Sequence, residues 1–216
     1  MNLNKSTKLF MDETTAPVLD PGRGKVKKGY FWARARDDRP WNGEDPPSVA
    51  FTYAPGRAGK HAADILRDFE GILQVDGYTG YNRVIDPKRQ GNIQLAHCWA
   101  HARRKLFKLT ENSTATIAKE GLKQITALYR IEAQIRGLSA PERLAVRKAK
   151  SAPLVADFKI WLDQARLQVS AKPPTGEALK DIAKYWGGLI PFLSDGRIEL
   201  DKSPIERTIR PIAIGR

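Results

Sequence analysis

The spacing of hydrophobic residues changes character along this chain. Near the N-terminus, turn-forming segments separate three short strand-like runs, at 8–11, 30–36 and 48–54. Because turns and not helices join these runs, an antiparallel meander is expected. The next hydrophobic residues have the i, i+3, i+4, i+7 spacing of one amphipathic helix: Ala62, Ile65, Leu66 and Phe69. Two further strand-like runs follow, at 72–75 and 93–97, so this region predicts a mixed α/β sheet.

A long helical region follows, from Trp99 to about Leu193. Within it, Ser139 and Glu142 have the S-x-x-E form of a capping box, which predicts that a new helix begins there. Residues 194–201 return to strand-like and turn chemistry, and Ser-Pro-Ile-Glu at 203–206 then has the signature of a helix start. The predicted division is therefore a first core part at 1–98, a helical insertion at 99–193, and a return to the core at 194–216.

Composition narrows the functional classes. The 216 residues are 41% hydrophobic, enough for a folded core, and no run approaches the length of a membrane span. The start of the chain shows no signal-peptide pattern, and its single cysteine, which excludes an intrachain disulfide, is typical of a reduced cytosolic protein. Lys and Arg number 37 against 24 Asp and Glu, a formal net charge of +13. This excess favours nucleic acid as a partner over a generically basic soluble protein.

Three acidic residues lie at predicted ends of elements: Asp12 at the end of the first strand, Asp76 at the end of the fourth, and Glu206 in the last helix. If the two strands are neighbours, Asp12 and Asp76 lie side by side and repel each other unless a cation lies between them. Magnesium is the natural cation, and two such ions about 4 Å apart support in-line phosphoryl transfer. Each residue also has a purely structural explanation, because Asp favours turns and a capping box accounts for Glu206. Glu13 is an equally good local candidate beside Asp12.

The basic residues allow two interpretations. A run of charges on a helix is usually a solvated face, but it can also track phosphates without reading the base sequence. The candidates for DNA contact are Lys25, Lys27, Lys28, Arg103, Arg104, Arg207 and Arg210.

His97, Cys98 and His101 form a separate cluster in the sequence. Their spacing suggests zinc, but a fourth ligand is missing, and a lone Cys between a strand and a helix is usually buried. A contact of His101 with phosphate or with a carboxylate is the better functional interpretation, because its segment starts where a strand ends. His101 is therefore counted with the DNA-binding candidates.

Four segments of this chain, in this order, closely resemble the transposases of the insertion sequence 66 family. They are MDET at 11–14 with VLDPG at 18–22, LQVDGYTGY at 73–81, HCWAHARR at 97–104, and DGRIELD at 195–201 through ERTIRPIAIGR at 206–216. Each segment alone is a weak signal, but together they span nearly the whole chain and make the resemblance specific.

The resemblance implies an RNase H-like catalytic core of the DDE type, interrupted by a helical insertion before the last acidic residue. It implies that Asp12, Asp76 and Glu206 bind two divalent ions, Mg²⁺ or Mn²⁺, with Asp12 and Asp76 sharing one of them. The implied reaction is cleavage of DNA at the ends of a mobile element and joining of the 3′-hydroxyl to target DNA. A bacterial cytoplasmic protein associated with the nucleoid, with no membrane partner, is the expected setting.

The chain also departs from the family pattern. Members usually carry two asparagines between the last Asp and the Glu, where this chain has Lys202 and Ser203, which changes the hydrogen bonding near the site. Members extend further at both ends, so a fragment or truncated copy of a longer protein is expected. The resemblance leaves open whether accessory proteins of the same element and self-association take part.

Three alternatives remain at this point. The first is a truncated DNA-binding remnant without catalysis, and the second is an RNase H-like nuclease that cuts without joining. The third is a basic scaffold protein, in which the acidic residues serve only as turns and caps.

Overall fold

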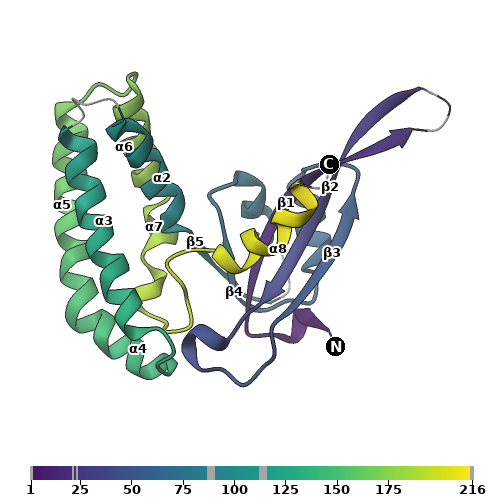
Figure 1. Cartoon of the computed structure of the whole chain (residues 1–216), viewed down its shortest axis with the longest axis horizontal. Coiled ribbons are helices and arrows are strands. Elements are labelled where there is room, and N and C mark those ends of the chain that lie inside the picture. The colour runs from purple at the N-terminus through teal and green to yellow at the C-terminus, as the bar shows by residue number, and fades with distance from the viewer. Residues whose placement is uncertain (1, 21, 23, 87–90, 112–115, 215–216) are drawn as a thin grey trace. The chain divides into compact units, whose positions relative to one another are not determined.

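A five-stranded mixed sheet forms the first part of the fold (Figure 1). The computed structural model describes residues 2–20, 22, 24–86, 91–111 and 116–214. The strand order is β3-β2-β1-β4-β5, with bounds β1 Lys8–Asp20, β2 Lys25–Arg36, β3 Ser48–Ala54, β4 Gly71–Val75 and β5 Ile93–His97. β1 pairs antiparallel with β2 and parallel with β4, and β2 pairs antiparallel with β3. The predicted mixed α/β sheet is thereby confirmed.

The first two strands are longer than expected. Their pairing continues from Phe10↔Ala35 out to Asp20↔Lys25. Asp12 therefore lies inside β1, paired with Ala33, and the prediction that it ends the strand was wrong. Lys25, Lys27 and Lys28, which lie outside the predicted strand 30–36, belong to β2.

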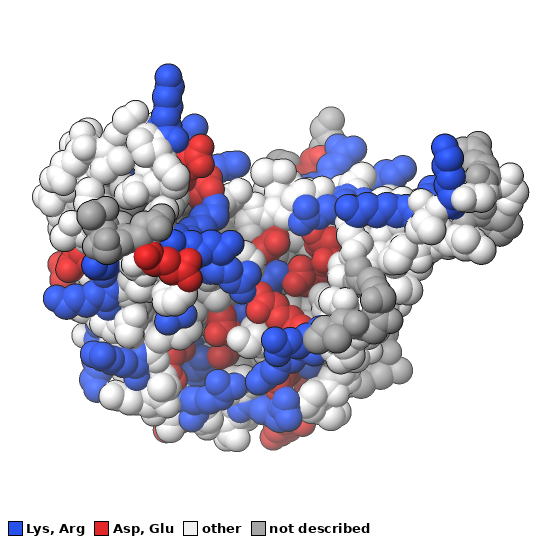
Figure 2. Space-filling model, turned by 45° about the horizontal axis from the view of Figure 1, so that its top comes forward, with Lys and Arg blue, Asp and Glu red and all other residues white. Residues whose placement is uncertain are grey.

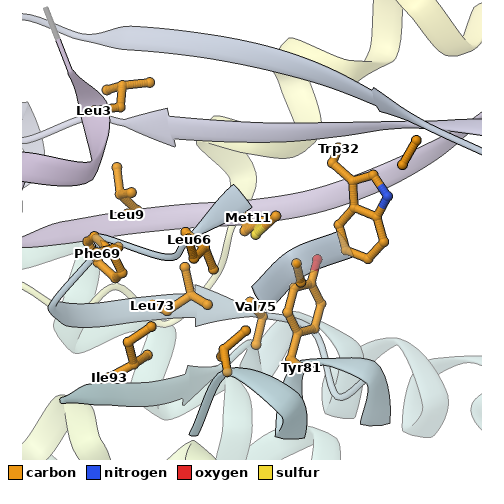
Figure 3. Close-up of a cluster of buried hydrophobic side chains, with 13 residues drawn as sticks. Leu3, Leu9, Met11, Trp32, Leu66, Phe69, Leu73, Val75, Tyr81 and Ile93 are labelled. Carbon is orange, nitrogen blue, oxygen red and sulfur yellow. The ribbon is translucent and has the colours of Figure 1, made fainter. Parts of the chain in front are cut away.

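One face of the sheet carries the larger hydrophobic core (Figure 3). Helix α1, Gly59–Ile65, and the 3₁₀ helix Thr79–Ile85 accompany this core. Its largest members are Leu9, Met11, Trp32, Leu66, Phe69, Leu73 and Tyr81, all essentially inaccessible to solvent. Leu66 and Phe69 lie after the end of α1 but are buried. The predicted hydrophobic stripe therefore identifies the buried residues correctly, although two of them lie outside the helix.

A second, smaller core lies against α8, Ser203–Ile214. It consists of Phe10, Ala33, Ala35, Ile205 and Ile209. Two isoleucines four residues apart lie on one side of a helix, and the small side chains of β2 let that side approach the sheet closely. Ser203, expected at the N-cap, is the first helical residue, and the carbonyl of Lys202 accepts the N–H of Glu206 in its place.

The rest of the described chain is helical. Its helices are α2 Trp99–Thr110, α3 Thr116–Ile135, α4 Ala140–Val146, α5 Ala152–Gln168, α6 Pro174–Lys184 and α7 Trp186–Leu189, with a π-helical turn at Arg147–Ser151 between α4 and α5. α2 packs on α3 and α6, and α5 packs on the same two helices. The predicted capping box is present, since Glu142 accepts the backbone N–H of Ser139 at 2.9 Å. Residues 194–201 form turns and no strand.

The chain divides into two compact units. The sheet unit contains residues 1–38, 44–95 and 202–216, and the helical unit contains residues 39–43 and 96–201. Trp99 anchors the helical unit, because its indole N–H donates to the Leu189 carbonyl at 2.8 Å and its ring meets Phe158, Trp186 and Phe192 edge-on. In the described parts of the chain, helices of membrane-spanning length and apolarity are absent.

Candidate active site

Strand β1 presents its side chains alternately to the two faces of the sheet. Phe10 packs with α8, whereas Leu9 and Met11 belong to the larger core on the opposite face. Because side chains alternate with a period of two, Asp12 faces the α8 side and Glu13 faces the other. The sequence left these two carboxylates as equal candidates, and the pleat of β1 separates them.

Asp76 follows directly after β4, the parallel neighbour of β1. The last paired residues are Phe10 and Gln74, so Asp12 and Asp76 each stand two residues further along their own strand. One carboxylate oxygen of Asp76 accepts the N–H of Tyr78 at 2.9 Å, which holds the side chain at the start of the glycine-rich turn. The strands that lead to the two aspartates are therefore neighbours, which is the condition on which the sequence-based hypothesis depends.

Lys202 reaches both carboxylates. Its ammonium Nζ lies 2.7 Å from Oδ2 of Asp12 and 3.9 Å from Oδ2 of Asp76. The lysine side chain is 2% exposed, and the two aspartate side chains are 16% and 18% exposed. A buried ammonium is stable only with such partners, and the two carboxylates are relieved of mutual repulsion by the same charge.

Helix α8 brings Glu206 to the same side of the sheet. Ile205 packs into the smaller core, and Glu206, the next residue, lies in a cavity of about 480 Å³. The lining residues are Asp12, Ser203, Glu206, Arg207, Ile209, Arg210 and Ala213. Asp12 and Glu206 thus border one cavity with the two arginines, which supply bidentate donors of the kind that bind phosphate.

Glu13 has a different environment on the opposite face. Its side chain is 1% exposed, and it accepts the Tyr81 hydroxyl at 2.6 Å and Nε of Arg57 at 2.6 Å. Burial raises the pKa of Glu13 above its usual value, against the lowering effects of the hydrogen bonds from Tyr81 and Arg57. Arg57 lies over the Tyr78 ring at 4.0 Å, and the Tyr78 hydroxyl donates to the Arg57 carbonyl. Through its bonds to Tyr81 and Arg57, Glu13 therefore stabilises the turn that follows Asp76.

The predicted DNA-contacting lysines lie on a two-stranded arm. Beyond Tyr30, where the described pairing with β3 ends, residues 16–20 and 25–29 pair with each other and continue past the sheet (Figure 1). Lys25, Lys27 and Lys28 are exposed on this arm, and adjacent positions of a strand point to opposite faces. Figure 2 shows Lys and Arg spread over the visible face of the molecule, with Asp and Glu between them.

The remaining candidates belong to helix α2 of the helical unit. His101 is half-buried in the first turn, and Arg103 and Arg104 are exposed. The guanidinium of Arg103 lies 6.0 Å from the centre of the Tyr129 ring. Cys98, at the N-cap of α2, is buried, as expected for a structural cysteine.

The whole chain, residues 1–216, matches the family described as Transposase IS66 family. The chain belongs to this family. Its similarity extends to three uncharacterized proteins of Sinorhizobium fredii. It is 41% identical to y4qI over 219 residues and 37% identical to y4jD over 217 residues, each alignment covering 99% of this chain, and 37% identical to y4hP over 222 residues, covering 97%. The chain spans 40–42% of the length of these relatives.

In this IS66-family chain, the carboxylates have the chemistry of a site for a hard divalent cation, because Asp12 and Asp76 offer oxygens to one shared position. The ammonium of Lys202 holds that position. Among the residues that the structure describes, no three His, Cys, Asp or Glu side chains are close enough together to hold a metal ion. Glu206 therefore borders the cavity of Asp12 without joining the two aspartates.

Sequence reasoning did not foresee the contact of Lys202 with the two aspartates or those of Arg57 and Tyr81 with Glu13. The only signal for Lys202 was its departure from the family pattern. Arg57 and Tyr81 contact Glu13 although they lie 44 and 68 residues further along the chain. A local sequence pattern does not predict contacts over such separations.

Proposed function

We propose that this chain is part of the catalytic core of an IS66-family transposase and that it cleaves DNA and joins the 3′-hydroxyl to target DNA. The observation that supports the proposal best is that Asp12 and Asp76 stand at matched positions along two neighbouring parallel strands, and that Asp12 and Glu206 line one cavity. The mixed sheet order β3-β2-β1-β4-β5 with α8 on one face agrees with an RNase H-like core of the DDE type.

Each carboxylate has a role in this proposal. Asp12 and Asp76 hold the shared cation position, and Glu206, on the same side of the sheet, completes a second position. Magnesium or manganese, when bound there, supplies the Lewis acidity that phosphoryl transfer requires. Asp76 is held by the Tyr78 N–H, so its second oxygen stays directed toward the shared position.

The arginines and lysines bind the DNA backbone. Arg207 and Arg210 line the cavity beside Glu206 and place guanidinium donors where a scissile phosphate would enter. The arm with Lys25, Lys27 and Lys28 is a two-stranded ribbon, a shape that the major groove of DNA admits. We place His101, Arg103 and Arg104 of α2 among the further phosphate contacts. The protein acts on DNA in the bacterial cytoplasm, at the nucleoid.

One assay separates this function from its alternatives. End-labelled duplex DNA taken from both sides of the gene is incubated with a target plasmid in Mg²⁺ or Mn²⁺, and the products are resolved on gels. We expect cut strands and, in addition, labelled DNA joined to the plasmid. The charge-neutral variant Glu206→Gln should give neither product while binding DNA as the parent protein does.

The other outcomes identify the alternatives. Cutting that is never followed by joining indicates an RNase H-like nuclease. DNA binding without cutting or joining indicates a remnant, and the absence of all three indicates a scaffold protein. Products that persist in Glu206→Gln would remove that residue from the proposed site.

A further inference from the structure

The backbone of Lys202 is held at the start of α8, and its side chain extends to two carboxylates. Its carbonyl accepts the N–H groups of Ile205 and Glu206 at 3.1 and 3.2 Å, which ties the residue to the start of α8. From this point the side chain extends to the two aspartates and is buried. A flexible, strongly hydrated ammonium is rarely buried without a specific reason, and here the reason is the pair of carboxylates.

The ammonium takes the place of a bridging cation. It lies 2.7 Å from Asp12 and 3.9 Å from Asp76, so it neutralises the same two oxygens that a shared divalent ion would bind. An ammonium and a divalent ion repel each other and cannot both occupy this position. A metal ion enters this site only if the lysine side chain leaves it.

We propose that Lys202 is a resident cation that competes with divalent metal ions for Asp12 and Asp76, and so sets a high threshold for metal binding. This inference rests on the proposed function, because it concerns the same carboxylates. The neighbouring cavity, which Asp12 and Ser203 both line, gives the displaced side chain room, while its backbone stays in place at the helix start.

The first test measures Mn²⁺ binding without DNA and without catalysis. Titration calorimetry is performed on the wild type, on Lys202→Met, which keeps the length of the side chain without its charge, and on Lys202→Gln, a polar neutral variant. Far-UV circular dichroism and cooperative melting verify the fold of each. We expect both variants to bind Mn²⁺ at least about tenfold more tightly than the wild type. Adding Asp76→Asn to Lys202→Met should abolish the gain.

A second measurement uses the wild type alone. An amine-reactive reagent labels accessible lysines, and mass spectrometry quantifies Lys202 with and without saturating Mn²⁺. Labelling of Lys202 should rise several-fold with Mn²⁺, because displacement exposes its amine. Lys28 on the exposed arm is the internal control and should not change. An unchanged Lys202 signal at saturating metal would overturn the inference.

The calorimetric outcomes distinguish the two claims. If the Lys202 variants bind Mn²⁺ no more tightly than the wild type, and adding Asp76→Asn to Lys202→Met abolishes binding, Lys202 does not compete and the proposed function stands. If Asp76→Asn leaves Mn²⁺ binding intact, or if none of these proteins binds Mn²⁺, the carboxylates are not a metal site and both claims fail.

Discussion

Buried charges are paired differently in the two units, as one cluster from each unit of the described chain shows. In the helical unit, Arg147 is fully buried and uses all five of its N–H donors. Two bonds reach Glu132, at 2.7 and 2.6 Å, and three reach the carbonyls of Phe192, Asp195 and Ile198. In the sheet unit, one lysine ammonium serves two aspartates at unequal distances.

The difference distinguishes a structural cluster from the cluster that we propose as the catalytic site. The rigid fork of Arg147 ties α3 to the turns at 192–198, and Arg143 adds ion pairs to Glu132 and Glu199. With all five of its donors used, Arg147 has no free position for a ligand. The single ammonium of Lys202, by contrast, faces carboxylates of which one borders an open cavity. A flexible lysine can withdraw from such a site, whereas the arginine cannot withdraw without breaking five hydrogen bonds.

The largest expected effect on stability comes from breaking the arginine cluster. Arg147→Ala leaves the largely buried carboxylate of Glu132 without its main partner and removes the donors to three carbonyls. We expect a loss of about 3–5 kcal/mol in the free energy of unfolding, measured by urea denaturation. Lys148→Ala, at the exposed neighbouring position, is the matched control and should change the value by less than about 0.5 kcal/mol. A loss for Arg147→Ala no larger than the control would show that the network is not structural.

Removing the charge of Lys202 should lower the free energy of unfolding by less than removing Arg147 does. In metal-free buffer, Lys202→Met leaves Asp12 and Asp76 facing each other, but both retain some exposure to water. We expect a loss of about 1–3 kcal/mol in the same denaturation experiment, clearly smaller than for Arg147→Ala. An equal or larger loss would mean that Lys202 is as structural as Arg147.

A smaller effect is expected on the opposite face of the sheet. Tyr81→Phe removes the hydroxyl that donates to Glu13 at 2.6 Å and leaves the ring in its packed position. We expect a loss of about 1–2 kcal/mol, because a buried carboxylate loses one of two charge-stabilising hydrogen bonds. Thermal melting of Tyr81→Phe beside Tyr53→Phe, whose ring is exposed, gives the measurement and its control. Equal melting temperatures would show that this bond contributes nothing.

The smallest effect on stability is expected at the arm. Lys27→Ala with Lys28→Ala should leave the unfolding free energy within about 0.5 kcal/mol of the wild type, because both side chains are exposed. DNA affinity should fall, and the slope of log affinity against log salt should decrease by about 1 for each phosphate that the variant no longer neutralises. An unchanged slope, measured by fluorescence anisotropy, would exclude the arm from DNA contact.

Much of the sheet was predictable from local patterns. The bounds predicted for β3 and β5, 48–54 and 93–97, agree with the structure. Proline and glycine residues flank the first run on both sides. β1 and β2 were underestimated, since the arm at 16–20 and 25–29 is held by cross-strand pairing and carries exposed apolar residues such as Leu19. Pairing between distant segments is a tertiary property, which the composition of either strand alone does not reveal.

The site was predictable only in part. Asp76 was visible as a carboxylate directly after an apolar strand, but Asp12 and Glu13 were indistinguishable. The run 8–11 has Leu, Phe and Met in succession, so the alternation that assigns each face was hidden until α8 was in place. Lys and Arg side chains usually face solvent, so neither the burial of Arg147 nor that of Lys202 was foreseen.

The most direct test of the central claim is cleavage of DNA from both sides of the gene, in excess Mn²⁺, by the wild type and by Asp76→Asn. This substitution keeps the shape and the hydrogen bond to the Tyr78 N–H while it removes the charge. We predict that Asp76→Asn slows cleavage at least about a thousandfold, about 4 kcal/mol in activation free energy, and leaves the fold intact. Asp68→Asn, at an exposed position of the same unit, should cleave at the wild-type rate. Cleavage by Asp76→Asn at the wild-type rate would contradict the assignment of this carboxylate pair as the catalytic site.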